Sequence, residues 1–194
     1  MEPFRPTRGG GVRAWLAAPE ASLLRSLVGQ VLTLIAPDGP VPPRPQDAAT
    51  ATSWDDVAAL EALLDEDPAA IPRTPQDPVL ARLLPDGYRD DPEAAGEFRK
   101  YTEPSLRSAK QQAALAMLDT LPDAGGRIQL TQEQAQAWLK ALNDVRLALG
   151  VRLDVTEDFE QQWAKLKQDD PQWAAYEVYA WLGAVQESLV QALA

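Results

Sequence analysis

Proline is distributed unevenly along this chain of 194 residues, and that distribution limits the possible folds more than any other feature. Of the 17 prolines, 12 lie between Pro37 and Pro104. Each proline lacks a backbone N–H and restricts the residue before it, so regular elements in this region must be short or interrupted. We therefore expect the secondary structure in the middle of the chain to be interrupted, and we expect a Pro-rich mobile loop at 37–52.

Apolar residues recur at helical spacing on both sides of this region. Pro19 suits the first turn of a helix, and leucines and valines follow it at intervals of three and four residues as far as Ile35. Later in the chain, Thr131 and Gln134 form a capping-box pattern at the head of an amphipathic helix, and Gly150 is its expected left-handed C-cap. Both helices should bury one apolar face.

Aspartate-proline pairs mark further helix starts, because aspartate suits the N-cap and proline suits the first turn. None of the acidic pairs in the chain has the ligand spacing of a calcium-binding loop, so we interpret them as caps and expect no metal site. The expected helices are 53–64, 78–84, 92–102, one from Glu103 or Pro104 to Leu121, 159–167, and a last one from Pro171 almost to Ala194.

Strand signals are few and short. The segments 4–8 and 12–16 flank Gly9, Gly10 and Gly11, which permit the positive φ angles of a hairpin turn. A third strand near 127–130 follows a glycine pair and can join this hairpin. The sequence thus predicts a mainly α fold, a multi-helix bundle with a small antiparallel β element, in one domain over residues 1–194.

Composition excludes several kinds of chemistry. The chain has no cysteine and no histidine. It therefore has no thiol nucleophile, no Ser-His triad and none of the usual zinc, haem or iron-sulfur ligands, and we expect no cofactor. The formal net charge of −11 disfavours binding to phosphate backbones and anionic membranes. Because no apolar stretch suits a signal peptide or a membrane span, a cytoplasmic protein is expected.

Charged residues within apolar helix faces form one candidate site. Glu103, Lys110, Asn143, Asp144 and Arg146 occur on two helices and are predicted to form a buried polar network between them. A buried charge needs a partner, since desolvating it alone costs several kcal/mol. A carboxylate beside lysine or arginine can also be catalytic, although structural networks are more frequent.

The last helix concentrates aromatic residues. Trp173, Tyr176, Tyr179 and Trp181 lie among further apolar positions on more than one face. This pattern is typical of a central core helix. The alternative is that these four residues form an interface with a protein partner or in a homodimer.

Three stretches resemble the actinobacterial AosR family, which is catalogued mainly as a domain of unknown function. They are DPVLARLLPDGYR (77–89), LTQEQAQAWLKALNDVRLALGVRL (130–153) and YEVYAWLGAVQESLVQALA (176–194). The resemblance implies an actinobacterial cytoplasmic protein, encoded near a Clp-protease adaptor, and in some members a transcriptional regulator that responds to oxidative stress. Sensing through a cysteine pair is impossible in this chain.

These observations favour a non-catalytic regulator of transcription in a stress response, acting through protein contacts, for example with a sigma factor or RNA polymerase, and forming a homodimer. Direct DNA binding through the basic N-terminal arm, with Arg5, Arg8 and Arg13, is the first alternative. The second is an enzyme that uses carboxylate and lysine chemistry.

Overall fold

The structure, a computed structural model, describes residues 2–36, 75–88, 90–167, 169–170 and 172–194. The expected loop at 37–52 and helix at 53–64 lie outside these residues. The mainly α fold with a small antiparallel sheet is confirmed. The strands are β1 (Glu2–Pro6), β2 (Val12–Leu16) and β3 (Gly126–Leu130), and the helices are α1 (Ala18–Leu34), α3 (Pro78–Leu83), α4 (Pro92–Thr120), α5 (Gln132–Arg152), α6 (Phe159–Lys165) and α7 (Trp173–Leu193).

The predicted hairpin and its third strand form one antiparallel sheet in the order β1-β2-β3. Strand alternation sends one set of side chains to the core. Gly125 leads into β3 with a φ of +75°, and a Cβ there would lie 2.5 Å from the backbone nitrogen of Ala18. Only glycine fits this close approach between β3 and the start of α1. The inward side chains of the sheet are Phe4, Val12, Ala14, Leu16, Ile128 and Leu130.

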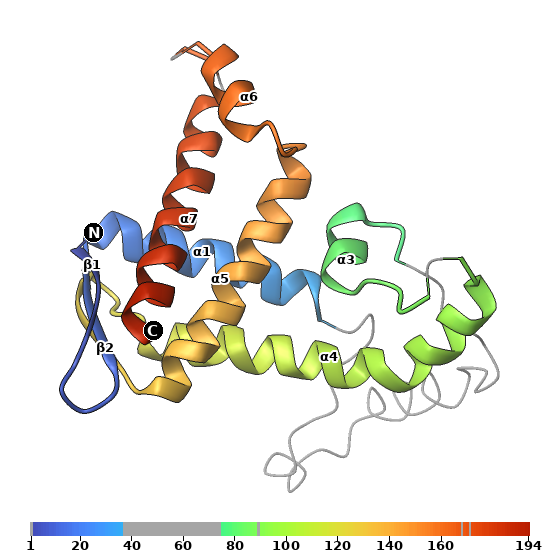
Figure 1. The fold of residues 1–194 in the computed structure, drawn as a ribbon, viewed down its shortest axis with the longest axis horizontal. Helices are drawn as coiled ribbons and strands as arrows, with labels where there is room; N and C mark the ends of the chain where they lie inside the picture. Colours follow the sequence, from blue (N-terminus) through green and yellow to red (C-terminus); the bar gives the residue numbers. More distant parts are fainter. Residues whose placement is uncertain (1, 37–74, 89, 168, 171) are drawn as a thin grey trace, which may run out of the picture.

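Helix α5 lies at the centre of the helical part and contacts α1, α3, α4 and α7. In Figure 1, α4 runs along one side of the molecule, and α5 and α7 rise side by side from the end that carries the sheet. Trp138 of α5 is fully buried, and the edge of the Phe4 ring lies against it at a centroid distance of 5.8 Å. Its indole nitrogen donates to Thr120 Oγ1 at 2.7 Å, so this core joins β1, α4 and α5.

Local capping signals correctly predicted most helix starts. The side chain of Asp77 accepts hydrogen bonds from two backbone amides of α3, and that of Asp91 accepts one at the start of α4. Thr131 and Gln134 form the expected capping box of α5. Helix α7 begins only at Trp173, slightly later than Asp170-Pro171 indicated.

Helix α4 differs from the prediction of two helices, because it continues through Pro104. Hydroxyl groups bond to carbonyls in the turn around the proline: Thr102 Oγ1 donates to Phe98 O at 2.9 Å, and Ser105 Oγ donates to Thr102 O at 2.8 Å. Ion pairs made by Glu103 with arginines one turn before and one turn after it also hold the helix together. A proline inside a helix is tolerated where neighbouring contacts compensate for the missing N–H.

The expected C-cap at Gly150 is also wrong, because α5 continues to Arg152. The residue with positive φ is Asp154, at 50°. The N–H of Val155 donates to Gly150 O, and that of Asp154 donates to Val151 O, which is the hydrogen-bond pattern of a Schellman motif. A Cβ at Gly150 would lie 3.4 Å from the Tyr179 ring, which is an ordinary van der Waals distance, so the structure does not require glycine at this position.

Candidate functional site

Glu103 is the centre of a charged row along α4. Arg99 donates to Glu103 Oε2 and to Asp86 Oδ1, and it also donates to the Leu84 carbonyl at 3.1 Å. Arg107 donates through Nε to Glu103 Oε1 at 2.7 Å. The row therefore ties α4 to the carbonyl that ends α3.

The same row reaches the end of α1. Arg107 Nη1 donates to Ile35 O at 3.2 Å, and Gln111 Nε2 donates to the same carbonyl at 3.4 Å. The last carbonyls of a helix have no partner within it, so side-chain donors satisfy them. These contacts give the row a structural role at two helix ends.

Burial and pairing act in opposite directions on these charges. Burial alone would raise the pKa of Glu103, but hydrogen bonds from Arg99 and Arg107 lower it. Burial alone would lower the pKa of Arg99, but its hydrogen bonds to Asp86 and Glu103 raise it. Both side chains are therefore held in their charged forms.

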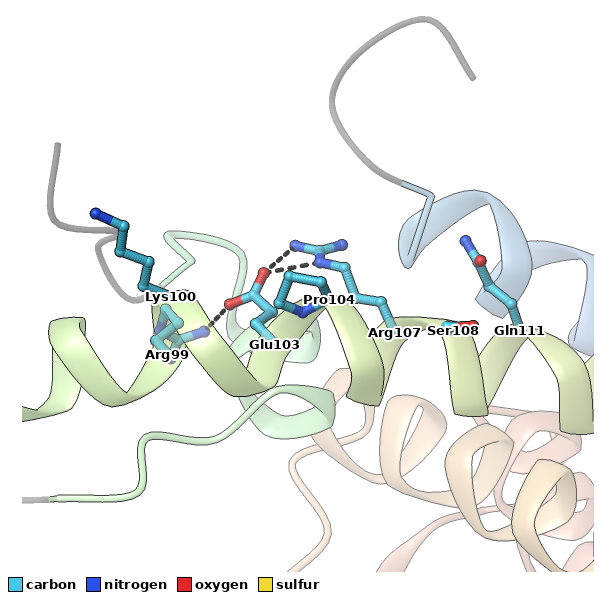
Figure 2. A pocket seen from close by; sticks show the side chains of 7 residues that line it. All are labelled: Arg99, Lys100, Glu103, Pro104, Arg107, Ser108 and Gln111. Atoms are coloured by element: carbon cyan, nitrogen blue, oxygen red, sulfur yellow. Dashed lines mark hydrogen bonds and ion pairs between the residues drawn. The ribbon is translucent and has the colours of Figure 1, made fainter. Parts of the chain in front are cut away.

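A pocket of about 380 Å³ lies along this face of α4. Figure 2 shows the side chains that line it. Two of the pocket's ionisable lining residues, Arg99 and Arg107, already pair with a third, Glu103. An ionised carboxylate with a lowered pKa is a weak general base, and guanidinium groups do not give up a proton. The pocket is lined by Arg99, Lys100, Glu103, Pro104, Arg107, Ser108 and Gln111.

Lys110 and Asp144 form the ion pair that joins α4 to α5. Lys110 Nζ lies 2.6 Å from Asp144 Oδ1, and both side chains are largely buried. Burial raises the pKa of Asp144, and the lysine offsets this only in part. Among the described residues, this is the ion pair that connects the two helices of the predicted network.

The other predicted members lie elsewhere, so the five residues do not form one network among the described contacts. Arg146 faces α7, where its Nη1 donates to Gln186 Oε1 at 2.9 Å and its guanidinium carbon lies 5.3 Å from the centre of the Tyr179 ring. Asn143 is exposed on α5. Glu103 belongs to the arginine row on α4.

The aromatic residues of α7 pack mainly against α6. The Phe159 ring stacks on Tyr176 with an interplanar angle of 5° and lies 5.0 Å from the Tyr179 ring. Trp163 lies 5.6 Å from Trp173. Three of the four candidate interface residues thus have partners within the chain, and Trp181 is partly buried against the core.

Sequence reasoning missed the role of two arginines on α4. Arg99 and Arg107 alternate with glutamates and suggest a solvated surface, yet Arg99 is only 5% exposed. The available signal was spacing, because Arg99 lies four residues after the buried Ala95 and four before Glu103.

Comparison of the sequence with known proteins identifies a family. The sequence matches the family described as "Domain of unknown function (DUF2017)" over residues 1–193. The chain belongs to this family. No solved structure matches this member of DUF2017.

Two curated relatives of this DUF2017 chain carry a descriptive name. The oxidative stress regulator AosR of Mycobacterium tuberculosis (strain ATCC 25618 / H37Rv) is 35% identical over 198 residues, which cover 95% of this chain and 83% of that protein. The protein of the same name from Mycobacterium bovis matches with the same identity and coverage.

The ionisable groups of this DUF2017 chain are separated in ways that bear on the enzyme hypothesis. That hypothesis needs Glu103 with Lys110, or Asp144 with Arg146, to face solvent together in a hollow. Glu103 lines the pocket without Lys110, and Asp144 is only 4% exposed. Within the described ranges there is no group of three or more acidic side chains placed to hold a metal ion.

None of the described helices has the length and apolarity to cross a bilayer.

Proposed function

We propose that this chain is a non-catalytic regulator in a stress response that acts on transcription through protein partners. The observation that carries the proposal is the match at 35% identity, over 95% of the chain, to proteins named oxidative stress regulators. Two features support it: the sequence has no cysteine or histidine, and the described buried charges are engaged in joining helices.

Protein contact is favoured over unaided operator binding because of charge. A chain with a net charge of −11 repels the negatively charged DNA backbone, which weakens direct binding to DNA. RNA polymerase or a sigma factor is the partner that we propose. A homodimer stays a prediction, which sedimentation equilibrium checks directly.

The proposal is tested by tagging the chain in its native bacterium and purifying it with and without peroxide treatment. We expect RNA polymerase subunits or a sigma factor to be enriched over a tag-only strain. Recovery of this chain alone under both conditions would contradict the proposal.

Direct DNA binding is the second candidate, because Arg5, Arg8 and Arg13 are exposed on or beside the hairpin. Gel shifts with promoter fragments at low and high salt separate it from the first. A tight, promoter-specific complex formed by the purified chain alone would favour this candidate, whereas weak binding lost at high salt would favour protein partners.

A further inference from the structure

The outer face of the sheet carries arginines and an exposed tryptophan. Alternation along the strands places Arg5, Arg13, Trp15 and Arg127 on the side opposite the core, and all four are exposed. Arg5 lies opposite Arg13 in the register of β1 and β2, and Trp15 lies opposite Arg127 in that of β2 and β3. We call these four residues the arginine face.

These arginines differ from most arginines on the helices, although Arg8 in the hairpin turn and Arg82 on α3 also lack a described partner. Arg5, Arg13 and Arg127 make no hydrogen bond or ion pair within the described residues, whereas arginines on α1, α4 and α5 bind carboxylates, carbonyls or amides. Like charges directly opposite each other on neighbouring strands destabilise a sheet. The packing of the sheet therefore gives no reason for arginine at these positions.

The face is also distinct within an acidic molecule. The full chain carries a net charge of −11, so the remainder of the chain is more negative still when these arginines are set aside. Glu2, opposite Trp15, is the acidic residue within the strand register of this face. A local positive surface of this kind attracts an anionic group.

We infer that the arginine face binds an extended acidic segment of a protein partner. Carboxylates of that segment pair with Arg5, Arg13 and Arg127, because guanidinium groups match carboxylates in two-pronged hydrogen bonds. An apolar side chain of the segment packs on Trp15, which is 46% exposed. This inference rests on the proposed function in one respect, namely that the ligand belongs to a protein.

Size and charge favour a peptide over a nucleic acid. Strands of five residues span about 16 Å, and a sheet of three strands is about 10 Å across. A DNA duplex carries about nine phosphate charges over that length and continues past both edges toward the acidic body. A peptide can end its run of carboxylates at the edges of the face.

Fluorescence anisotropy tests the inference with the full chain and a labelled glutamate-rich peptide that has one central leucine. We expect saturable binding that weakens as NaCl rises from about 50 to 200 mM. The triple variant R5Q/R13Q/R127Q should bind about tenfold more weakly, since each exposed pair contributes only modestly. The control K140Q/K165Q/K167Q makes the same change of charge at exposed positions away from the sheet and should bind like the unmodified chain.

Two further measurements guard against misfolding and a wrong ligand class. The variant Trp15→Thr keeps every arginine and should weaken binding severalfold, and circular dichroism verifies that each variant folds. The inference is wrong if the peptide does not bind, if a glutamine version of the peptide binds equally well, or if the triple variant and its control bind alike. Tighter binding of an oligothymidylate of equal length would show that the face binds nucleic acid and not an acidic peptide.

The proposed function and this inference can fail separately. If tagged chain and tagged triple variant recover equal amounts of RNA polymerase, the proposed function stands and the arginine face is not its docking surface. If the peptide binds as expected but neither protein recovers the transcription machinery, the face binds acidic peptides and the proposed function fails.

Discussion

Arg146 forms a polar contact between α5 and α7, so its replacement tests a structural role directly. Its hydrogen bond to Gln186 and its position over Tyr179 are together worth about 1–2 kcal/mol. We expect Arg146→Met to lower the free energy of unfolding by that amount, measured by urea denaturation. Lys140→Met, at an exposed position on the same helix, is the matched control. An unchanged midpoint for Arg146→Met would mean that the contact contributes nothing.

Glu103 and Asp144 should make stability depend on pH with opposite signs. The pKa of Glu103 is lowered in the folded chain by Arg99 and Arg107 despite burial, so its contribution is present above the unfolded pKa and is lost as pH falls through the folded pKa. The pKa of Asp144 is raised by burial. Its contribution is therefore full below the unfolded pKa and is lost as pH rises through the folded pKa.

Two isosteric substitutions separate these effects. As pH rises toward about 4.5, the ordinary pKa of a glutamate, the stability of Glu103→Gln relative to the unmodified chain should fall. As pH rises above about 3.8, the ordinary pKa of an aspartate, the relative stability of Asp144→Asn should rise. Urea midpoints at several pH values give both differences. A difference that changes in the same direction for both variants would show that one of the two environments is misassigned.

At the level of elements, the continuity of α4 through Pro104 gives a prediction that two separate helices would not. Proline inside a helix costs about 3 kcal/mol relative to alanine, and the surrounding contacts recover part of this. Pro104→Ala should therefore stabilise the chain by about 1–3 kcal/mol and increase helical circular dichroism slightly. If residue 104 instead began a new helix, alanine would bring no gain, because proline is favourable in a first turn.

Local signals predicted elements well, and contacts between distant segments explain what they missed. The hairpin, the third strand and the capped starts of α3, α4 and α5 follow from a few residues each, such as Asp77 and Thr131. The prediction of a C-cap at Gly150 is wrong because Asp154, and not a glycine, adopts the left-handed backbone conformation that ends α5. The local pattern favoured the glycine, because glycine is the usual residue at such a position.

The candidate site was likewise predictable where local sequence signals decide and not where contacts between distant segments decide. The shared faces of two helices correctly suggested that Lys110 and Asp144 need partners, and the structure pairs them with each other. Arg146 pairs instead with a residue of α7, 40 positions later in the chain. Arg99 is buried because its partners include Asp86 and the Leu84 carbonyl, which only the packing of α3 on this region supplies.

At the level of the whole molecule, the buried charges of the helical part contrast with the arginines of the sheet. Arg99 and Arg107 join α4 to the ends of α3 and α1, and Lys110 pairs with Asp144 between α4 and α5. The arginines on the outer face of the sheet make no such contact among the described residues. Groups engaged in holding helices together cannot also bind a partner, so we expect the proposed regulator to bind a ligand at the sheet.

The absence of cysteine from the full chain leads to a prediction about how such a regulator could respond to oxidants. Diamide oxidises thiols and has no target here, and Met117 is fully buried. We expect diamide to leave the melting temperature, sedimentation and peptide binding of the purified chain unchanged. As a check on the reagent, the exposed-site variant Ser22→Cys should form a disulfide-linked dimer under the same conditions.

A crossed experiment then locates the origin of any redox dependence. This chain and a captured partner are treated with diamide separately, freed of reagent, and mixed in all four combinations. Binding should change only when the partner has been treated, because only the partner can carry a responsive thiol. Dependence on treatment of this chain would require oxidation of another side chain and would place the sensor here. The expected result would mean that the partner senses the oxidant and that this chain binds the partner according to its redox state.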